Sequence, residues 1–258
     1  VRAEVGYGGG DFTVSHGRVY FVQKGSGRIY RLDIGGGSPV AITPDFGRSA
    51  SMTVSPCGQW LLYVHHDEGE DRLAVVDTDG RHWPRILAEG WDFYMQPRWS
   101  SCGKRMAWVS WNHPNMPWDG SVLHVAQVLV DGEILPAIDN VEALDGAGDV
   151  SVFQPEFSKD SKTVYYVSDR EGFGQIWKVD IETGERTRLT FSEEEFGQPA
   201  WVQDLRTFAL LENDEKALVI VNRQGFMRLG VANLLDGTLV ELESFEGYGD
   251  FSHISVSA

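Results

Sequence analysis

Gln96-Pro97-Arg98-Trp99 is the first of three Gln-Pro-x-aromatic tetrapeptides in this chain, and their recurrence decides the fold. The other two are Gln154-Pro155-Glu156-Phe157 and Gln198-Pro199-Ala200-Trp201, so the motif returns after 58 residues and again after 44. Internal repeats with a period of roughly 40 to 50 residues are typical of propellers and other repeat arrays. The sequence therefore predicts a fold assembled from similar units.

A turn of the form Ser-x-x-(Gly/Ser) follows the first strand of such a unit, and a short apolar run follows each turn. The turns are Ser55-Pro56-Cys57-Gly58, Ser100-Ser101-Cys102-Gly103 and Ser158-Lys159-Asp160-Ser161. A third apolar run ends in an acidic turn, as at Val76-Asp77-Thr78-Asp79-Gly80, and a shorter fourth run closes the unit. Four short strands separated by tight turns predict an antiparallel propeller blade. No segment has a convincing helical spacing of apolar residues, so we expect almost no helix.

We therefore predict an all-β fold, a single β-propeller domain over residues 1–258 with five full four-stranded blades and a surplus C-terminal strand at 249–257. The blades span roughly 5–45, 46–91, 92–149, 150–194 and 195–246. The fifth unit offers five candidate strands, including Pro199-Ala200-Trp201-Val202, and the sequence does not decide which one is extra. The third unit carries a long insertion from Asn112 to Gly120.

The composition excludes several classes of partner. Lys and Arg number 22 against 38 Asp and Glu, which gives a net charge of −16. Such a surface argues against binding to nucleic acid or to an anionic membrane. The sequence shows neither a long apolar run that could span a membrane nor a signal peptide. Cys57 and Cys102 are the only cysteines, and we expect free thiols and a cytoplasmic protein.

The insertion is also the most specific sign of a relationship. Trp111-Asn112-His113-Pro114-Asn115-Met116-Pro117-Trp118-Asp119-Gly120 resembles a segment of the propeller domain in serine peptidases of the prolyl oligopeptidase family, in its acylaminoacyl-peptidase or dipeptidyl-aminopeptidase branch. Residues 152–158 and 168–177 give weaker support, and similar strings occur in TolB-like propellers. The resemblance runs along essentially the whole chain. It implies a non-catalytic domain that gates access to an active site and binds peptide substrate.

The catalytic triad of that family belongs to a separate α/β-hydrolase domain, which carries a Gly-x-Ser-x-Gly nucleophile turn. These 258 residues contain no such motif. The nearest string, Gly47-Arg48-Ser49-Ala50-Ser51, lacks the second glycine and precedes a predicted strand. We therefore expect no catalytic residue here, and the α/β-hydrolase domain as a partner. The alternative is a stand-alone TolB-like propeller that binds a protein or peptide, and open sheet edges would also allow a homodimer.

Candidate substrate-binding residues come mainly from the insertion, because long loops in compact folds are often binding loops. The full set is Trp111, His113, Asn115, Met116, Trp118, Asp119, Glu156 and Arg170. In this hypothesis the aromatic residues, His113 and Met116 line a peptide pocket, and Asp119 meets a positive group. The competing interpretation is a rigid loop that packs on its own blade. Glu156 lies on an inner-strand motif, and Arg170, beside Asp169, either faces substrate or fixes a turn.

Two other polar strings carry weaker hypotheses. His65 and His66 are neighbours on a predicted strand and point to opposite faces, so they should not share a metal ion. Glu193-Glu194-Glu195 is either a solvated turn or an attraction site for a peptide amino terminus. We predict neither a metal nor a cofactor.

Overall fold

Four-stranded antiparallel sheets follow one another along the chain, as the repeat predicts. The computed structural model describes residues 1–6, 8–132, 134–245 and 247–256. The first two sheets contain β1 (Phe12–Ser15), β2 (Arg18–Val22), β3 (Ile29–Asp33), β4 (Val40–Ala41), and β5 (Arg48–Val54), β6 (Trp60–Asp67), β7 (Glu70–Asp77), β8 (Arg85–Ala88). The third and fourth contain β9 (Phe93–Trp99), β10 (Arg105–Trp111), β11 (Val122–Leu129), β12 (Ala137–Gly146), and β13 (Val152–Phe157), β14 (Thr163–Ser168), β15 (Gln175–Asp180), β16 (Arg186–Arg188). The fifth contains β17 (Phe208–Leu210), β18 (Lys216–Arg223), β19 (Phe226–Asn233) and β20 (Leu239–Glu241).

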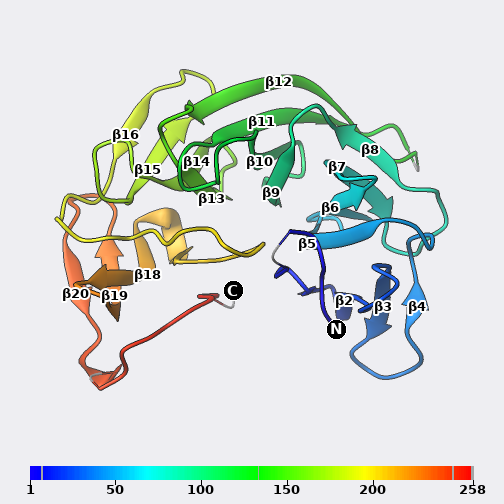
Figure 1. Cartoon of the computed structure of the whole chain (residues 1–258), viewed down its shortest axis with the longest axis horizontal. Helices are drawn as coiled ribbons and strands as arrows, with labels where there is room; N and C mark the ends of the chain where they lie inside the picture. Colours follow the sequence, from blue (N-terminus) through cyan, green and yellow to red (C-terminus); the bar gives the residue numbers. More distant parts are fainter. Residues whose placement is uncertain (7, 133, 246, 257–258) are drawn as a thin grey trace.

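The five sheets stand side by side in an arc, in chain order (Figure 1). Within the described ranges there is no α-helix, and the helical residues are the short 3-10 turns η1 (Glu212–Asp214) and η2 (Glu243–Phe245). The predicted all-β propeller with five four-stranded blades is confirmed.

The Ser-x-x-(Gly/Ser) turns join the first two strands of three consecutive sheets. In the second sheet the Ser55 carbonyl accepts a hydrogen bond from Gly58 N at 2.8 Å, and the Ser55 hydroxyl accepts one from Trp60 N at 3.0 Å. Gly58 has φ of +75°, a conformation that costs glycine little. The serine therefore satisfies two backbone donors that the hairpin would otherwise leave unpaired. The cysteines in two of these turns, Cys57 and Cys102, are exposed free thiols.

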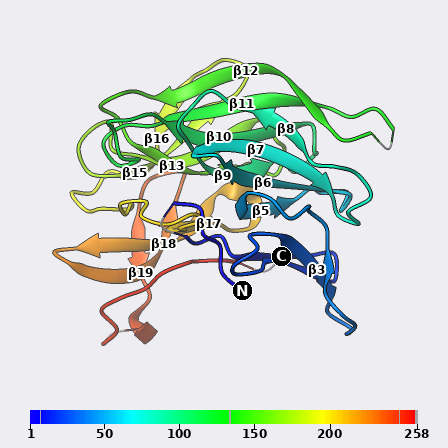
Figure 2. The same ribbon diagram turned by 45° about the vertical axis from the view of Figure 1, so that its right-hand side comes forward.

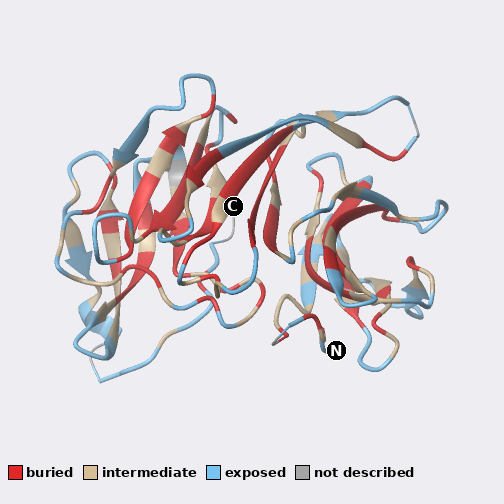
Figure 3. Cartoon of the chain, turned by 45° about the horizontal axis from the view of Figure 1, so that its top comes forward, coloured by how far each residue is buried: buried red, intermediate tan, exposed pale blue. Residues whose placement is uncertain are grey.

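The core lies between neighbouring sheets, whose facing sides are buried (Figure 3). One apolar cluster joins the first three sheets and includes Trp108, a second joins the third and fourth around Tyr166, and a third joins the fourth and fifth around Phe208. Burying a large apolar side chain contributes roughly 1.5–3 kcal/mol, so each blade depends on its neighbours for stability.

The fifth unit differs from its sequence pattern. Residues 199–202, which read as a strand, belong to no strand, and the sheet is built from β17 to β20 instead. Residues 199–203 run toward the centre of the arc (Figure 1), where they lie beside the N-terminal segment (Figure 2). There Gln203 N donates to the Gly8 carbonyl at 2.8 Å, and Gln203 Nε2 donates to the Tyr94 carbonyl at 2.9 Å. The extra candidate strand therefore connects the N-terminal segment to β9 at the centre of the arc, which we call the hub. Residues 199–207 are the hub segment.

Two buried glutamines from the Gln-Pro-x-aromatic motifs fasten this segment to the inner strands. Gln96 in β9 has φ of +51° and Gln154 in β13 has φ of +54°, where each strand shifts register against its neighbour. Gln96 Nε2 donates to the Leu205 carbonyl at 2.6 Å, and Gln154 Oε1 accepts from Thr207 N at 2.6 Å. The bulge turns the side chains of Gln96 and Gln154 toward residues 205–207, so these two copies of the motif have the same role.

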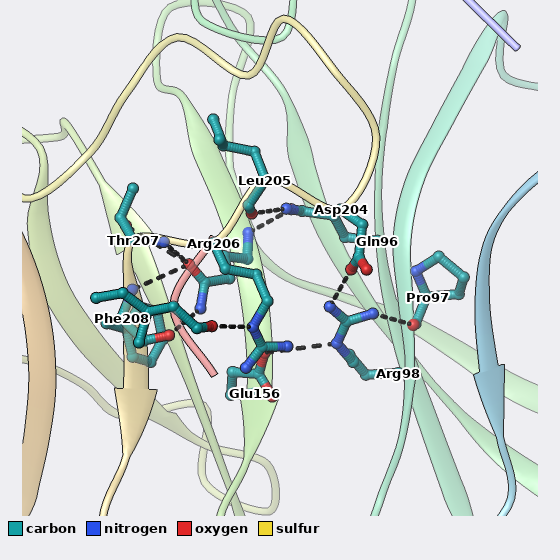
Figure 4. A network of polar contacts seen from close by, with 11 residues as sticks. Gln96, Pro97, Arg98, Glu156, Asp204, Leu205, Arg206, Thr207 and Phe208 are labelled. Carbon is teal, nitrogen blue, oxygen red and sulfur yellow. Dashed lines mark hydrogen bonds and ion pairs between the residues drawn. The ribbon is translucent and has the colours of Figure 1, made fainter. Parts of the chain in front are cut away.

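An ion-pair network continues these contacts (Figure 4). Arg98 Nε lies 3.4 Å from Glu156 Oε1, and its Nη2 lies 2.5 Å from Asp204 Oδ1. Arg206 Nη1 reaches the same Glu156 oxygen at 2.8 Å. The network links the third and fourth sheets to the segment that precedes β17.

The surplus strand is predicted at 249–257. Residues 249–256 are assigned to no strand, and residue 257 lies outside the described residues. Ile254 N donates to the Arg206 carbonyl at 3.4 Å, and the Ile254 side chain packs with Ile220 of the fifth sheet. This segment thus covers apolar surface on the face of the last sheet that has no following blade.

Candidate functional site

A cavity of about 260 Å³ opens beside the hub, at the end of the sheets where the insertion lies. Its wall comes from four parts of the chain that are distant in sequence: the N-terminal segment, the β6–β7 hairpin, β9 with the insertion, and the hub segment. The lining residues are Val5, Gly6, Asp71, Phe93, Met95, Trp111, His113, Met116, Pro117, Trp118, Ala200, Trp201 and Gln203. Four of the predicted substrate-binding residues, Trp111, His113, Met116 and Trp118, are therefore brought together.

Five of the lining residues carry aromatic rings, and these rings contact one another. Phe93 stacks on Trp111 with ring centroids 5.1 Å apart and meets the His113 ring at 4.9 Å. Trp118 from the insertion contacts Trp201 from the hub segment at 4.3 Å. Rings in such pairs hold each other in place, so the cavity presents a preformed apolar surface.

Two hydrogen bonds outside the cavity fix the shape of the insertion. Asp119 Oδ2 accepts from Met116 N at 2.9 Å, and Asn115 Nδ2 donates to the Gly148 carbonyl at 2.7 Å. Neither Asn115 nor Asp119 lines the cavity, and Asp119 is exposed. Both residues therefore have a structural task in the loop, and the contact of Asp119 with a positive group stays a prediction.

Two buried polar side chains interrupt the aromatic wall. Asp71, at the start of β7, is 5% exposed, and its Oδ1 lies 2.7 Å from His66 Nδ1. Burial raises the pKa of Asp71, and the hydrogen bond from His66 opposes that rise. Gln203, also 5% exposed, uses its Nε2 on the Tyr94 carbonyl, and its Oε1 has no hydrogen-bond partner among the described residues.

The structure places Glu156 and Arg170 away from this cavity. Glu156 lies in the hub network with Arg98 and Arg206. The Arg170 guanidinium pairs with the buried carboxylate of Asp145. Asp169 Oδ1 accepts from Ser151 N at 2.7 Å, which is the turn-fixing role considered for it. Contact of Glu156 and Arg170 with substrate stays a prediction.

The residues considered as metal ligands or as a nucleophile have structural surroundings of their own. His66 pairs with Asp71, while the buried His65 packs its ring against Phe46 at 5.3 Å. Across the residues that could be described, no group of three or more His, Cys, Asp or Glu side chains is arranged to hold a metal ion. Ser49 is buried within β5 rather than exposed at a strand-to-helix turn, so it lacks the setting of a nucleophile.

The described part of the chain has no helix long and apolar enough to cross a bilayer.

Comparison with known proteins shows which proteins the chain as a whole is similar to. No protein-family model matches the chain. Among solved structures, a puromycin-hydrolyzing peptidase of Mycobacterium tuberculosis has a TM-score of 0.78 and 30% identity over 90% of this chain. A puromycin hydrolase has a TM-score of 0.82 and 29% identity over 93% of it. This chain covers only 37% and 40% of those two chains.

TolB proteins are similar as well. A protein TolB homolog of Chlorobium luteolum is 25% identical over 175 residues, which are 67% of this chain and 36% of that protein. TolB of Acinetobacter baumannii shares the fold, with a TM-score of 0.60 at 17% identity. The predicted resemblance is confirmed: over nine-tenths of its length the chain is similar to the propeller domain of prolyl oligopeptidase family peptidases, and it shares its fold with TolB.

Proposed function

We propose that this propeller is the substrate-gating and substrate-binding part of a serine peptidase, and that the aromatic cavity holds an apolar side chain of a peptide-like substrate. One observation carries the proposal: the four aromatic, His and Met positions singled out in the insertion converge on one cavity with Phe93 and Trp201. The nucleophile would belong to an α/β-hydrolase domain, as the family resemblance implies. The propeller would then restrict access and position substrate, while the chemistry takes place elsewhere.

The size and lining of the cavity set the scale of what it binds. Pockets for drug-sized ligands usually measure roughly 300–1,000 Å³, and this one is about 260 Å³. It therefore suits a single aromatic group rather than a whole peptide. Burial of one such ring contributes roughly 1.5–3 kcal/mol, which is enough for selectivity but not for tight binding by itself.

Titration with puromycin tests the cavity, because the similar peptidases are named for its hydrolysis. We expect binding by isothermal titration calorimetry, and a loss of about tenfold in affinity for Trp118→Ala, since a ring contact contributes about 1.4 kcal/mol. Trp83→Ala is the matched control, because Trp83 is exposed and does not line the cavity. Equal losses in the two variants, or no binding at all, would contradict the assignment.

The non-catalytic part of the proposal has its own test. The chain should show no labelling by a fluorophosphonate probe, because Ser49 is buried in a strand and no nucleophile turn is present in the sequence. Gel fluorescence after incubation with the probe measures this, with a known serine hydrolase as positive control. A covalently labelled chain would show that a reactive serine exists and would overturn this part.

A second candidate function is a TolB-like propeller that binds a protein or peptide without attached enzyme, which the similarity to the TolB homolog favours. In that case puromycin would not bind, and a partner would pair with an open sheet edge. A homodimer is one such partner, and light scattering after size-exclusion chromatography measures it. We also propose a cytoplasmic location, supported by the two unpaired thiols.

A further inference from the structure

We infer that Trp118 determines which ligands fit, because its ring separates the aromatic cavity from a second pocket and so limits how far a ligand can extend. The inference rests on the proposed binding function of the aromatic cavity and adds the shape of its ligand. A ligand with two separate side groups, as a peptide has, can place one group in each pocket. A ligand whose two rings form one rigid rod cannot pass the Trp118 ring.

The second pocket lies beside the fourth sheet and measures about 200 Å³. Phe153 of β13 and Val167 of β14 contribute apolar side chains to its wall, and Ser151 and Gln198 contribute polar ones. Trp118 lines this pocket as well as the aromatic cavity. One indole ring therefore forms a wall of both spaces.

The hub segment completes the division between the two pockets. Pro199 lines the second pocket, whereas the next two residues, Ala200 and Trp201, line the aromatic cavity. Trp201 N donates to the Pro199 carbonyl at 2.8 Å, so the chain makes a tight turn between the two pockets. The Trp201 ring contacts the Trp118 ring, with ring centroids 4.3 Å apart. Two indole rings from distant parts of the chain thus form a divider.

The backbone on both sides of Trp118 is held in place, which makes the ring a wall rather than a lid. Before it, the carbonyl of the buried Pro117 accepts a hydrogen bond from Ser151 Oγ at 2.9 Å. After it, Gly120 is packed so closely that an added Cβ would lie 2.4 Å from the Gly148 carbonyl group. With its backbone fixed and its ring packed on a second indole, Trp118 keeps one position.

The test compares a one-ring ligand, benzyl alcohol, with a two-ring ligand, 4-biphenylmethanol, by calorimetry. Both ligands are neutral, so the comparison measures space rather than charge. On the unaltered chain we expect about equal affinities, because the second ring has no pocket to enter and stays in water. In Trp118→Ala the two-ring ligand should bind at least about tenfold more tightly than the one-ring ligand, since burial of a ring contributes at least that much.

Met116→Ala is the matched control, because Met116 comes from the same insertion and lines the aromatic cavity but not the second pocket. This variant enlarges the cavity and leaves the divider in place, so the ratio of the two affinities should stay near that of the unaltered chain. Methyl NMR reports where the second ring lies. 4-Biphenylmethanol should shift the Val167 methyl signals in Trp118→Ala and leave them in place in the unaltered chain.

The outcomes separate this inference from the proposal on which it rests. If benzyl alcohol does not bind the unaltered chain, the proposed aromatic site is wrong and the divider falls with it. If benzyl alcohol binds and the two-ring ligand already binds the unaltered chain about tenfold more tightly, the aromatic site stands and the divider is wrong. An unchanged ratio in Trp118→Ala also contradicts the divider. Circular dichroism checks the fold of this variant, and Trp118→Leu, which keeps an apolar side chain, replaces it if it does not fold.

Discussion

Replacing Arg98 with alanine is expected to lower the free energy of unfolding by about 3 kcal/mol, because it leaves a hub carboxylate unpaired. Among the described residues, Asp204 forms an ion pair with Arg98, and Glu156 forms ion pairs with Arg98 and Arg206. Its side chain is 11% exposed. Burial alone would lower the pKa of Arg98, but the carboxylates of Asp204 and Glu156 outweigh burial and raise it, so the guanidinium stays charged. The effect is at the low end for a buried pair because 27% of the Asp204 side chain is exposed.

Urea unfolding followed by tryptophan fluorescence measures this loss, and Arg223→Ala is its control. Arg223 also pairs with two carboxylates, Glu194 and Glu241, but its side chain is 45% exposed. Exposed pairs contribute about 0–1 kcal/mol, so this variant should remain close to the parent protein. Similar losses for Arg98→Ala and Arg223→Ala would mean that the low exposure of Arg98 does not strengthen its ion pairs and that the hub network behaves as a surface network.

The blade repeat could be predicted because its signals are local. A Ser-x-x-Gly turn closes its own hairpin through the serine hydroxyl, so Ser55 or Ser100 identifies a turn without knowledge of the rest of the chain. The third Gln-Pro-x-aromatic motif shows the limit of this reasoning. Gln198-Pro199-Ala200-Trp201 matches the first two copies, but membership in a sheet depends on which segment pairs with β18, and residues 208–210 take that place. No local pattern records that competition.

The sequence also predicts only part of the candidate site, namely the residues that one local segment carries. The apolar residues of the insertion could be predicted as cavity residues because a single loop carries them. Asp71 lies in a hairpin rich in acidic residues, and Gln203 belongs to no motif. They reach the cavity only because the fold brings distant parts of the chain together, which no local pattern predicts. The motif predicts an inner strand for Glu156, which lies in β13, but the sequence does not reveal that Arg98 and Arg206 pair with its carboxylate.

Acidification should destabilise this protein partly through His124. The ring is 6% exposed, stacks on Trp108 at 5.3 Å and has its Nε2 2.8 Å from Ser110 Oγ. Burial lowers the pKa of His124 to about 4, from 6.5 in an unfolded chain. Between these two values the unfolded state binds the proton and the folded state does not. Stability is therefore full above pH 6.5 and falls as the pH drops toward 4, by about 2–3 kcal/mol from this residue.

His124→Gln isolates this contribution, because glutamine does not titrate. The substitution has a cost of its own through lost stacking on Trp108, but that cost is the same at every pH and cancels in the comparison. Urea unfolding at pH 7.5 and pH 4.5 should show that the parent protein loses about 2–3 kcal/mol more than the variant over this range, while carboxylates contribute equally to both. Parallel curves would mean that His124 takes up its proton in the folded state as readily as in the unfolded chain, and that the packing around Trp108 admits a charged ring.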